Sequence, residues 1–223
     1  MKRTRPQAYL AIAFFLPLLV CGCYPYRLPA YTGSYPYDTD PGHKGRPGLE
    51  GHSPWSVIPE SKEEMMPDGA SIRCDWKERM AQPYVFLNHT GDYRFLGSSI
   101  RRLLELGRGL SVDGPPFALY FDDPATTPAD ELRARVCLPV QNQPEKLIDG
   151  LSYEVLPRSM VVYAQVPGPY DETGRSYGAV FTYMQKLGWE RSGPLREIYL
   201  VNPAEVSDHN DLRAEVQVPA RVR

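Results

Sequence analysis

The 223-residue sequence is poor in histidine and cysteine and has no long run of positive charge. Its 25 Lys and Arg residues are offset by 27 Asp and Glu residues, which gives a net charge of −2. The chain therefore lacks the basic face that neutralises phosphates, and we expect no nucleic-acid partner. His43 and His52 lie in a loose, proline-rich segment where ligands do not converge, so we expect neither a metal site nor another cofactor.

The N-terminus combines a basic leader with an apolar run, Ala8–Val20, that is too short to span a bilayer comfortably. This pattern predicts a secretory signal peptide over residues 1–22. Gly22 before Cys23 resembles the end of a bacterial lipoprotein signal, which implies lipidation of Cys23 and attachment to a membrane. Because Tyr24 and not Asp follows the cysteine, the resemblance implies an exported protein on the outer membrane of a Gram-negative cell. The alternative is an ordinary signal peptide or short anchor in which Cys23 is incidental.

Residues 23–70 contain many Pro, Gly and Tyr residues and show no helical or strand period. They predict a flexible tether, extended by its prolines, that leads to a folded domain over residues 71–223. The tyrosines of the tether either dock on a partner or are solvated, and the sequence does not identify a protein partner. In the domain, Cys74 and Cys137 either form a disulfide, which an exported compartment permits, or remain buried thiols.

The domain contains an internal repeat. The segment YVFLNHTGDYRFLGSSIRRLLELG of the first copy matches VVYAQVPGPYDETGRSYGAVFTYMQKLG of the second. The aligned pairs are Gly91 with Gly168, Tyr93 with Tyr170 and Tyr120 with Tyr199. The matching order of glycine, tyrosine, helix and strand predicts two copies of a strand–helix–strand–strand module, at about residues 75–140 and 151–220.

Each copy predicts one main helix. Apolar residues recur at steps of three and four in both helices; they are Leu96, Ile100, Leu103 and Leu104 in the first, and Tyr177, Val180 or Phe181, Met184 and Leu187 in the second. This spacing places Tyr177 on a helix face in the core. Gly107 and Gly188 are suitable residues to end the two helices, because glycine is able to take positive φ. Two modules about an approximate two-fold axis predict an α+β fold with an antiparallel sheet, two main helices and a ligand cleft between the halves.

The repeat resembles the GyrI-like small-molecule-binding domain, which also forms the effector-binding part of several AraC-type and MerR-type regulators. The resemblance covers about residues 75–220. It rests on GPY before the second helix, on REIYLVNPAE and LRAEVQVPA near the end, and on HTGDY and FALYFDDPATTPADELRARV in the first copy. No DNA-binding helices precede the repeat in this sequence, so we do not expect the regulator form of the family.

Glu197 is the main candidate for ligand recognition. On an alternating strand it shares a face with Tyr199, whereas Ile198 lies on the opposite, apolar face. The resemblance implies that Glu197 is the buried acid that meets cationic, often aromatic ligands, and aromatic rings beside it would add cation–π attraction. The alternatives are an ion pair with Arg196 or Arg213, or plain exposure. The candidate ligand-binding residues are Glu197, Tyr199, Tyr170, Tyr93 and Tyr120, and each of the tyrosines is equally open to ordinary packing.

Three functions fit this sequence. The leading hypothesis is a membrane-tethered protein, without catalytic residues, that binds a small apolar molecule with or without a positive charge in the central cleft. The second is a hydrolase of strained-ring or alkylating compounds, which the resemblance implies for some relatives, with Glu197 as general base near Tyr170 or Tyr199. The third is an interaction scaffold whose cleft is filled by its own side chains.

Overall fold

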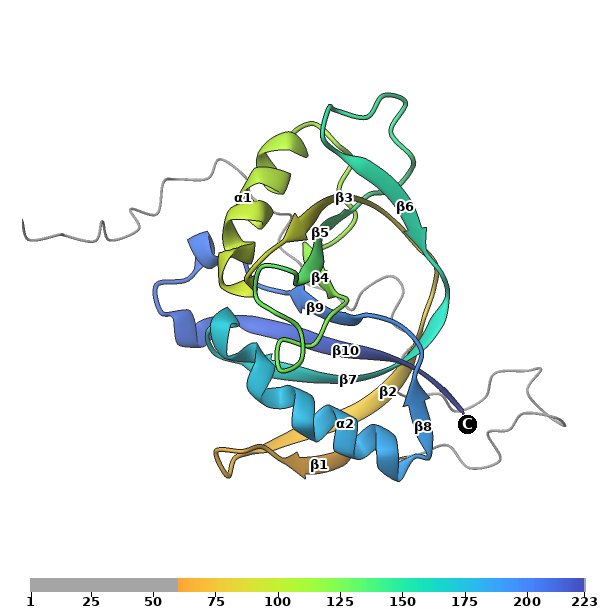
Figure 1. Ribbon diagram of the computed structural model, residues 1–223, viewed down its shortest axis with the longest axis vertical. Helices are drawn as coiled ribbons and strands as arrows, with labels where there is room; N and C mark the ends of the chain where they lie inside the picture. Colours follow the sequence, from red (N-terminus) through yellow and green to blue (C-terminus); the bar gives the residue numbers. More distant parts are fainter. Residues whose placement is uncertain (1–59, 223) are drawn as a thin grey trace, which may run out of the picture.

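The computed structural model describes residues 60–222, which form one antiparallel sheet and two main helices (Figure 1). The strands are β1 (Lys62–Met65), β2 (Ser71–Arg79), β3 (Gln82–Thr90), β4 (Phe117–Tyr120), β5 (Arg133–Pro139), β6 (Ser152–Leu156), β7 (Ser159–Pro167), β8 (Trp189–Arg191), β9 (Leu195–Tyr199) and β10 (Arg213–Val222). The helices are α1 (Leu96–Leu106) and α2 (Tyr177–Lys186), each preceded by a 3-10 segment, η1 (Tyr93–Phe95) and η2 (Tyr170–Ser176). Two further 3-10 turns, η3 (Pro203–Glu205) and η4 (His209–Asp211), lie between β9 and β10. In this part of the chain, no helix has the length and apolar character needed to cross a membrane.

The strand order shows the duplication. Within residues 60–222 the order is β1-β2-β7-β10-β9-β4-β5-β3-β6, with β8 paired to β10. If β1 and β8 are set aside, the sheet reads the same from either end, because β2 corresponds to β6, β7 to β3, β10 to β5 and β9 to β4. The predicted α+β fold, an antiparallel sheet with two main helices about a pseudo-two-fold axis, is therefore confirmed.

With β1 and β8 still set aside, each copy has one strand more than the predicted module, and this strand pairs with the other copy. β2 precedes β3 in the chain but pairs with β7, and β6 precedes β7 but pairs with β3. The β2–β3 and β6–β7 connections therefore cross between the halves, and neither copy completes its sheet alone. The repeat in the sequence did not indicate this exchange, because strand pairing depends on contacts with distant segments more than on local propensity.

The pseudo-two-fold axis passes through the central pair β4–β9, where Ala118 and Glu197 are direct cross-strand partners. Directly paired residues share a face of the sheet. The row that crosses the sheet at this level is Cys74, Ala164, Val216, Glu197, Ala118, Val136 and Leu87. Glu197 thus places a carboxylate in the middle of an otherwise apolar row.

Both helices pack on this same face, over the outer strands. Leu103 of α1 packs with Val85 and Val136, and Val180 of α2 packs with Val162. α1 contacts β3 and β5, whereas α2 contacts β1, β2, β7, β8 and β10. Figure 1 shows β4 and β9 between the two helices, so the middle of this face is the region that the helices leave open.

The opposite face carries a third apolar cluster. Its buried residues are Tyr84, Phe86, Phe117, Leu119, Cys137, Leu156 and Ile198. Ile198 is thus on the apolar side of β9, as the alternation of the strand predicts. Cys137 lies in this cluster and Cys74 lies in the cluster beneath α2, and both are free and buried. The structure therefore has two separate buried thiols and not the disulfide.

The folded domain begins earlier than the sequence predicts. β1 lies within the expected tether, residues 23–70, where Glu64 pairs with Lys186 of α2 at 2.7 Å and Met66 is buried. A strand of four residues is too short to show a period, and its place is decided by these contacts with α2. The predicted signal peptide, Cys23 and the remainder of the tether up to residue 59 lie outside the described residues.

Glycine is found at the ends of the two helices for different physical reasons. Gly188 uses the freedom of glycine, with a φ of 70°. Gly107 has a φ of −71° and does not need that freedom. A Cβ at Gly107 would lie 2.6 Å from Cδ2 of Leu138 in β5. Glycine is needed at this position because the end of α1 packs directly on the sheet.

Candidate functional site

A pocket of about 650 Å³ lies over the central pair β4–β9, in the range typical of small-molecule sites. Its lining comes from the helix starts, the central strands and the loops that follow them, and includes Tyr93, Leu96, Ile100, Leu104, Tyr120, Asp122, Tyr170, Asp171, Tyr177, Glu197, Tyr199 and Val201. All five candidate ligand-binding residues from the sequence are among these. The fold thus brings them to one cavity between the two copies, while their role in binding stays a prediction.

Glu197 lies on the floor of this pocket with 6% of its surface exposed. Tyr120 and Tyr199 donate hydrogen bonds to its Oε2 at 2.8 and 3.2 Å, and Tyr177 donates to its Oε1. The hydroxyls of Tyr120 and Tyr199 lie 3.1 Å apart, so these equivalent residues of the two copies meet across the axis. Three phenolic donors therefore surround one carboxylate.

Neither arginine considered as an ion-pair partner contacts Glu197. Arg196 is the preceding residue on β9 and points to the opposite face, where its Nη2 donates to Ser159 Oγ. The guanidinium of Arg213 donates to two backbone carbonyls of its own loop. The alternatives of an ion pair with these arginines and of plain exposure are therefore both wrong, since the carboxylate is buried and held by hydroxyls.

The environment of Glu197 opposes the negative charge of its carboxylate. Burial raises the pKa of Glu197 above its ordinary value, and the hydrogen bonds from the three tyrosines act against this rise. Burial likewise raises the pKa of Tyr120, Tyr177 and Tyr199, and the nearby carboxylate raises it further. The tyrosines therefore remain neutral donors at physiological pH. A cation next to Glu197 would favour its ionised form.

Tyr93 and Tyr170 form two matching walls of the pocket. The ring of Tyr93 stands edge-on to Tyr120 and the ring of Tyr170 is tilted against Tyr199, each with 4.9 Å between centroids. The Tyr170 hydroxyl donates to two backbone carbonyls, one after β9 and one at the start of β10, at 2.5 and 3.1 Å. Since this hydroxyl already has partners, the wall offers the pocket an aromatic surface and not a free donor.

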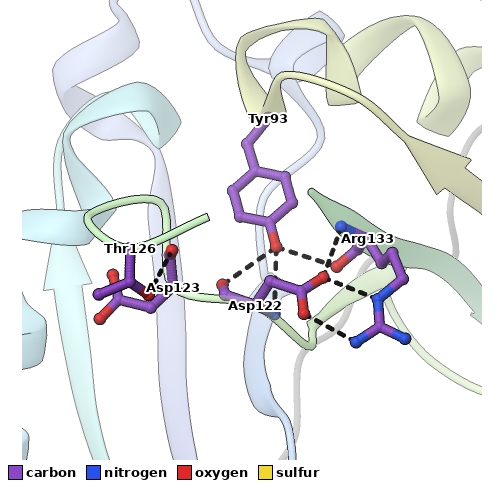
Figure 2. Close-up of polar contacts among 5 residues, drawn as sticks. All are labelled: Tyr93, Asp122, Asp123, Thr126 and Arg133. Atoms are coloured by element: carbon purple, nitrogen blue, oxygen red, sulfur yellow. Dashed lines mark hydrogen bonds and ion pairs between the residues drawn. The ribbon is translucent and has the colours of Figure 1, made fainter. Parts of the chain in front are cut away.

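The Tyr93 hydroxyl is held in the same way in the first copy, as Figure 2 shows. It donates to the backbone carbonyls of Asp122 and Arg133 at 3.1 and 2.9 Å. The Asp122 carboxylate accepts two hydrogen bonds from the Arg133 guanidinium at 2.8 and 2.9 Å, which lowers the pKa of Asp122. This second carboxylate of the pocket is thus already neutralised. Among residues 60–222, no group of three or more His, Cys, Asp or Glu side chains could hold a metal ion.

Tyr177 packs against the core cluster beneath α2, as the sequence predicts, and it also faces the pocket, which the sequence did not predict. It is half-buried, lines the pocket and donates to Glu197. The helical period correctly predicts an inward-facing position, but the start of α2 reaches over the central strands, where a pocket replaces the core. Its equivalent at the start of α1 is Leu96. This difference between the copies was the one feature of the sequence that could have identified Tyr177 as a pocket residue.

The two ends of the pocket differ in chemistry although the backbone is duplicated. The second copy supplies Glu197 and Tyr177, at positions where the first copy has Ala118 and Leu96. Ile100 and other aliphatic residues of α1 extend the wall beside Leu96. The pocket therefore has one polar end with a buried carboxylate that no cation compensates, one aliphatic end, and aromatic sides.

Comparisons with known proteins agree with this geometry. The family model described as the GyrI-like small molecule binding domain matches residues 74–221, well over half of the chain. No curated protein matches the sequence.

Several solved structures share the fold. The C-terminal domain of EcmrR has a TM-score of 0.59 and 18% identity, over 68% of this chain and 99% of that domain. EcmrR in its complex with DNA gives a TM-score of 0.59 and 18% identity over 67% of this chain, which spans 57% of the length of that protein. SAV2435 bound to tetraphenylphosphonium has a TM-score of 0.50 and 11% identity, over 66% of this chain and 93% of that one. At such low identity these likenesses show the fold alone.

Proposed function

Because this chain belongs to the GyrI-like small-molecule-binding family, we propose that its pocket binds a small apolar molecule that carries a positive charge. The observation that carries the proposal is the buried carboxylate of Glu197 on the pocket floor, surrounded by three tyrosine hydroxyls. An ionised carboxylate is costly to bury without a counter-charge, so a ligand cation gains affinity by supplying one. Aromatic walls add about 0.5–2 kcal/mol for each cation–π contact, depending on desolvation.

The unequal ends of the pocket predict how such a ligand lies. Its charge is placed at the polar end, beside Glu197 and Tyr177, and its apolar part lies against Leu96 and Ile100. Asp122 is neutralised by Arg133 and Asp171 is exposed to solvent, so Glu197 is the buried uncompensated carboxylate of the lining, which favours a ligand with one positive charge over a ligand with two. SAV2435, whose structure is bound to tetraphenylphosphonium, supports an apolar monocation as the first compound to test.

The test uses two ions of the same shape and opposite charge. Tetraphenylphosphonium and tetraphenylborate are titrated into wild type and Glu197→Gln by calorimetry. We expect the cation to bind wild type and to lose at least tenfold in affinity in the variant, because the counter-charge is gone while the pocket shape is kept. We expect the anion to bind wild type more weakly than the variant. Equal affinity of the cation for both proteins would show that Glu197 is not the counter-charge.

The same carboxylate supports the hydrolase as a second candidate. Glu197 has three tyrosine hydroxyls within hydrogen-bonding reach, so a base and adjacent proton donors are both present. Incubation with a reactive cyclopropane compound followed by mass spectrometry tests this, and absence of Glu197-dependent turnover removes it. The scaffold alternative requires a cleft filled by its own side chains, and a pocket of about 650 Å³ counts against it.

We further propose that the domain is exported and anchored to a membrane by lipid on Cys23, with residues 23–59 as the tether. The support is the basic leader, the apolar run and the Gly22-Cys23 pair of the sequence. Acyl chains contribute about 0.8 kcal/mol per buried methylene, so more than one chain is needed to hold the protein firmly. Cys23→Ala should move the protein from the membrane to the soluble fraction, whereas Cys21→Ala should not. An unchanged distribution in Cys23→Ala would contradict the lipid anchor.

A further inference from the structure

The face of the sheet opposite to the pocket contains a second polar site. It lies where the short β2–β3 and β6–β7 connections come together, on the right side of Figure 1. Arg79, at the end of β2, is the cross-strand partner of Ser159 in β7 and donates to Gln82 Oε1 at 2.9 Å. Arg196 reaches the same place from the middle of β9, since its Nη2 donates to Ser159 Oγ. Two guanidinium groups and one carboxamide are therefore close together.

These groups are buried to a degree that is unusual for positive charge. Arg79, Gln82 and Arg196 have 3%, 4% and 5% of their surface exposed. Charged side chains at this depth are normally paired with an opposite charge. Burial, followed by the positive charge of nearby Arg79, lowers the pKa of Arg196 to about 10. The surroundings of Arg196 therefore oppose its charge.

The described residues supply no counter-charge for Arg196. Its one hydrogen bond there is to Ser159 Oγ, at a long 3.3 Å, and its Nε–H has no partner. The Nε2 of Gln82 also has no partner. The nearest buried carboxylate on this face is Glu215, on β10, but it is bound by Lys77 at 3.0 Å and by Gln217. The unused groups around Arg196 and Gln82 are thus N–H donors next to an uncompensated positive charge.

A buried water is the competing explanation. Gln217 is the cross-strand partner of Arg196, and its Oε1 also lacks a partner, so one water could bridge this oxygen and Arg196 Nε. A water would satisfy those hydrogen bonds but leave the positive charge without compensation, which is the larger part of the cost of burial. An anion accepts from the free N–H groups and also compensates the charge.

We infer that Arg196, with Gln82 and the neighbouring Arg79, forms a buried binding site for a small inorganic anion of the size of chloride. The site is separate from the ligand pocket, because Arg196 and Glu197 point to opposite faces of β9, and the inference does not rest on the proposed function. Its effect is structural: the bound anion holds the β2–β3 and β6–β7 connections together where the copies exchange strands.

The test compares wild type with Arg196→Met, which keeps an unbranched apolar stem and removes the charge, and with Arg191→Met as a control at an exposed arginine. Thermal unfolding of the full chain is followed at constant ionic strength while sodium gluconate is replaced by sodium chloride. We expect chloride to raise the midpoint of wild type and of Arg191→Met. In Arg196→Met, the chloride concentration that gives half of the rise in unfolding midpoint should be at least tenfold higher, or chloride should no longer raise the midpoint. Equal responses in all three proteins would overturn the inference.

Diffraction from wild-type crystals soaked in bromide gives a second readout that requires no variant to fold. We expect an anomalous peak in contact with Arg196 Nε. Well-ordered crystals with a non-anomalous water at that position, and no bromide there, would favour the water and reject the anion. Tetraphenylphosphonium binding should be unchanged in Arg196→Met if it folds, which keeps this test distinct from that of the pocket.

Discussion

The carboxylate of Glu197 predicts a specific dependence of cation binding on pH. In the ligand-free protein, burial raises the pKa of Glu197 above the ordinary value of 4.5, so the group keeps its proton to higher pH than an exposed carboxyl group. A bound cation favours the ionised form and lowers this pKa again. Binding at a pH below the raised pKa must therefore expel a proton. Above that pKa, Glu197 is already ionised and no proton is released.

The magnitude follows from the presence of one titrating group. One released proton corresponds to a tenfold change in affinity for each pH unit, or 1.36 kcal/mol. Affinity for tetraphenylphosphonium should thus rise by up to tenfold per unit as pH increases from about 4.5, and then become constant. Stability of the ligand-free protein should change with the opposite sign. The contribution of protonated Glu197 is present at low pH and is lost as pH rises through the raised pKa.

Calorimetric titrations between about pH 4.5 and 7.5, in pairs of buffers with different ionisation enthalpies, measure affinity and proton release together. Glu197→Gln is the matched control, since it keeps the side-chain shape and cannot ionise. Wild type should release close to one proton at the acidic end, and the variant should release none. If wild-type affinity is constant over this range, or if the variant shows the same slope, the assignment of Glu197 as the titrating counter-charge is wrong.

Two further predictions concern neighbouring parts of the structure. Tyr177→Phe removes one donor to Glu197 and should weaken cation binding by roughly tenfold at acidic pH, since a hydrogen bond to a charged group contributes about 1.5–3 kcal/mol. If the same substitution weakens binding equally in the Glu197→Gln background, Tyr177 does not act through the Glu197 carboxylate. Gly107→Ala should destabilise the fold by about 1–3 kcal/mol in urea unfolding, because its Cβ would meet Leu138. Gly178→Ala, in a helix position with open space, should instead stabilise by up to about 1 kcal/mol, and similar outcomes for both would contradict the packing argument.

The sequence alone was sufficient for the duplication and for most of the pocket. Gly-x-Tyr turns, helical periods and alternating strands are local patterns, and each copy repeats them in the same order. The repeat therefore identified Tyr120 and Tyr199 as equivalent residues of the two copies, and their hydroxyls lie 3.1 Å apart. Strand alternation likewise put Glu197 and Ile198 on opposite faces, since successive side chains must alternate.

Other features depended on contacts between distant segments, which local pattern does not encode. The exchange of β2 and β6 between copies is decided by long-range packing. The same is true of the contact between β1 and α2, which includes the ion pair of Glu64 with Lys186. Tyr177 has the period of a core residue, and only the position of α2 above the central strands turns it toward Glu197. In the sequence, Arg196 appeared only as a possible ion-pair partner of Glu197. It is buried on the opposite face, where it contacts Ser159 of β7, far away in the chain.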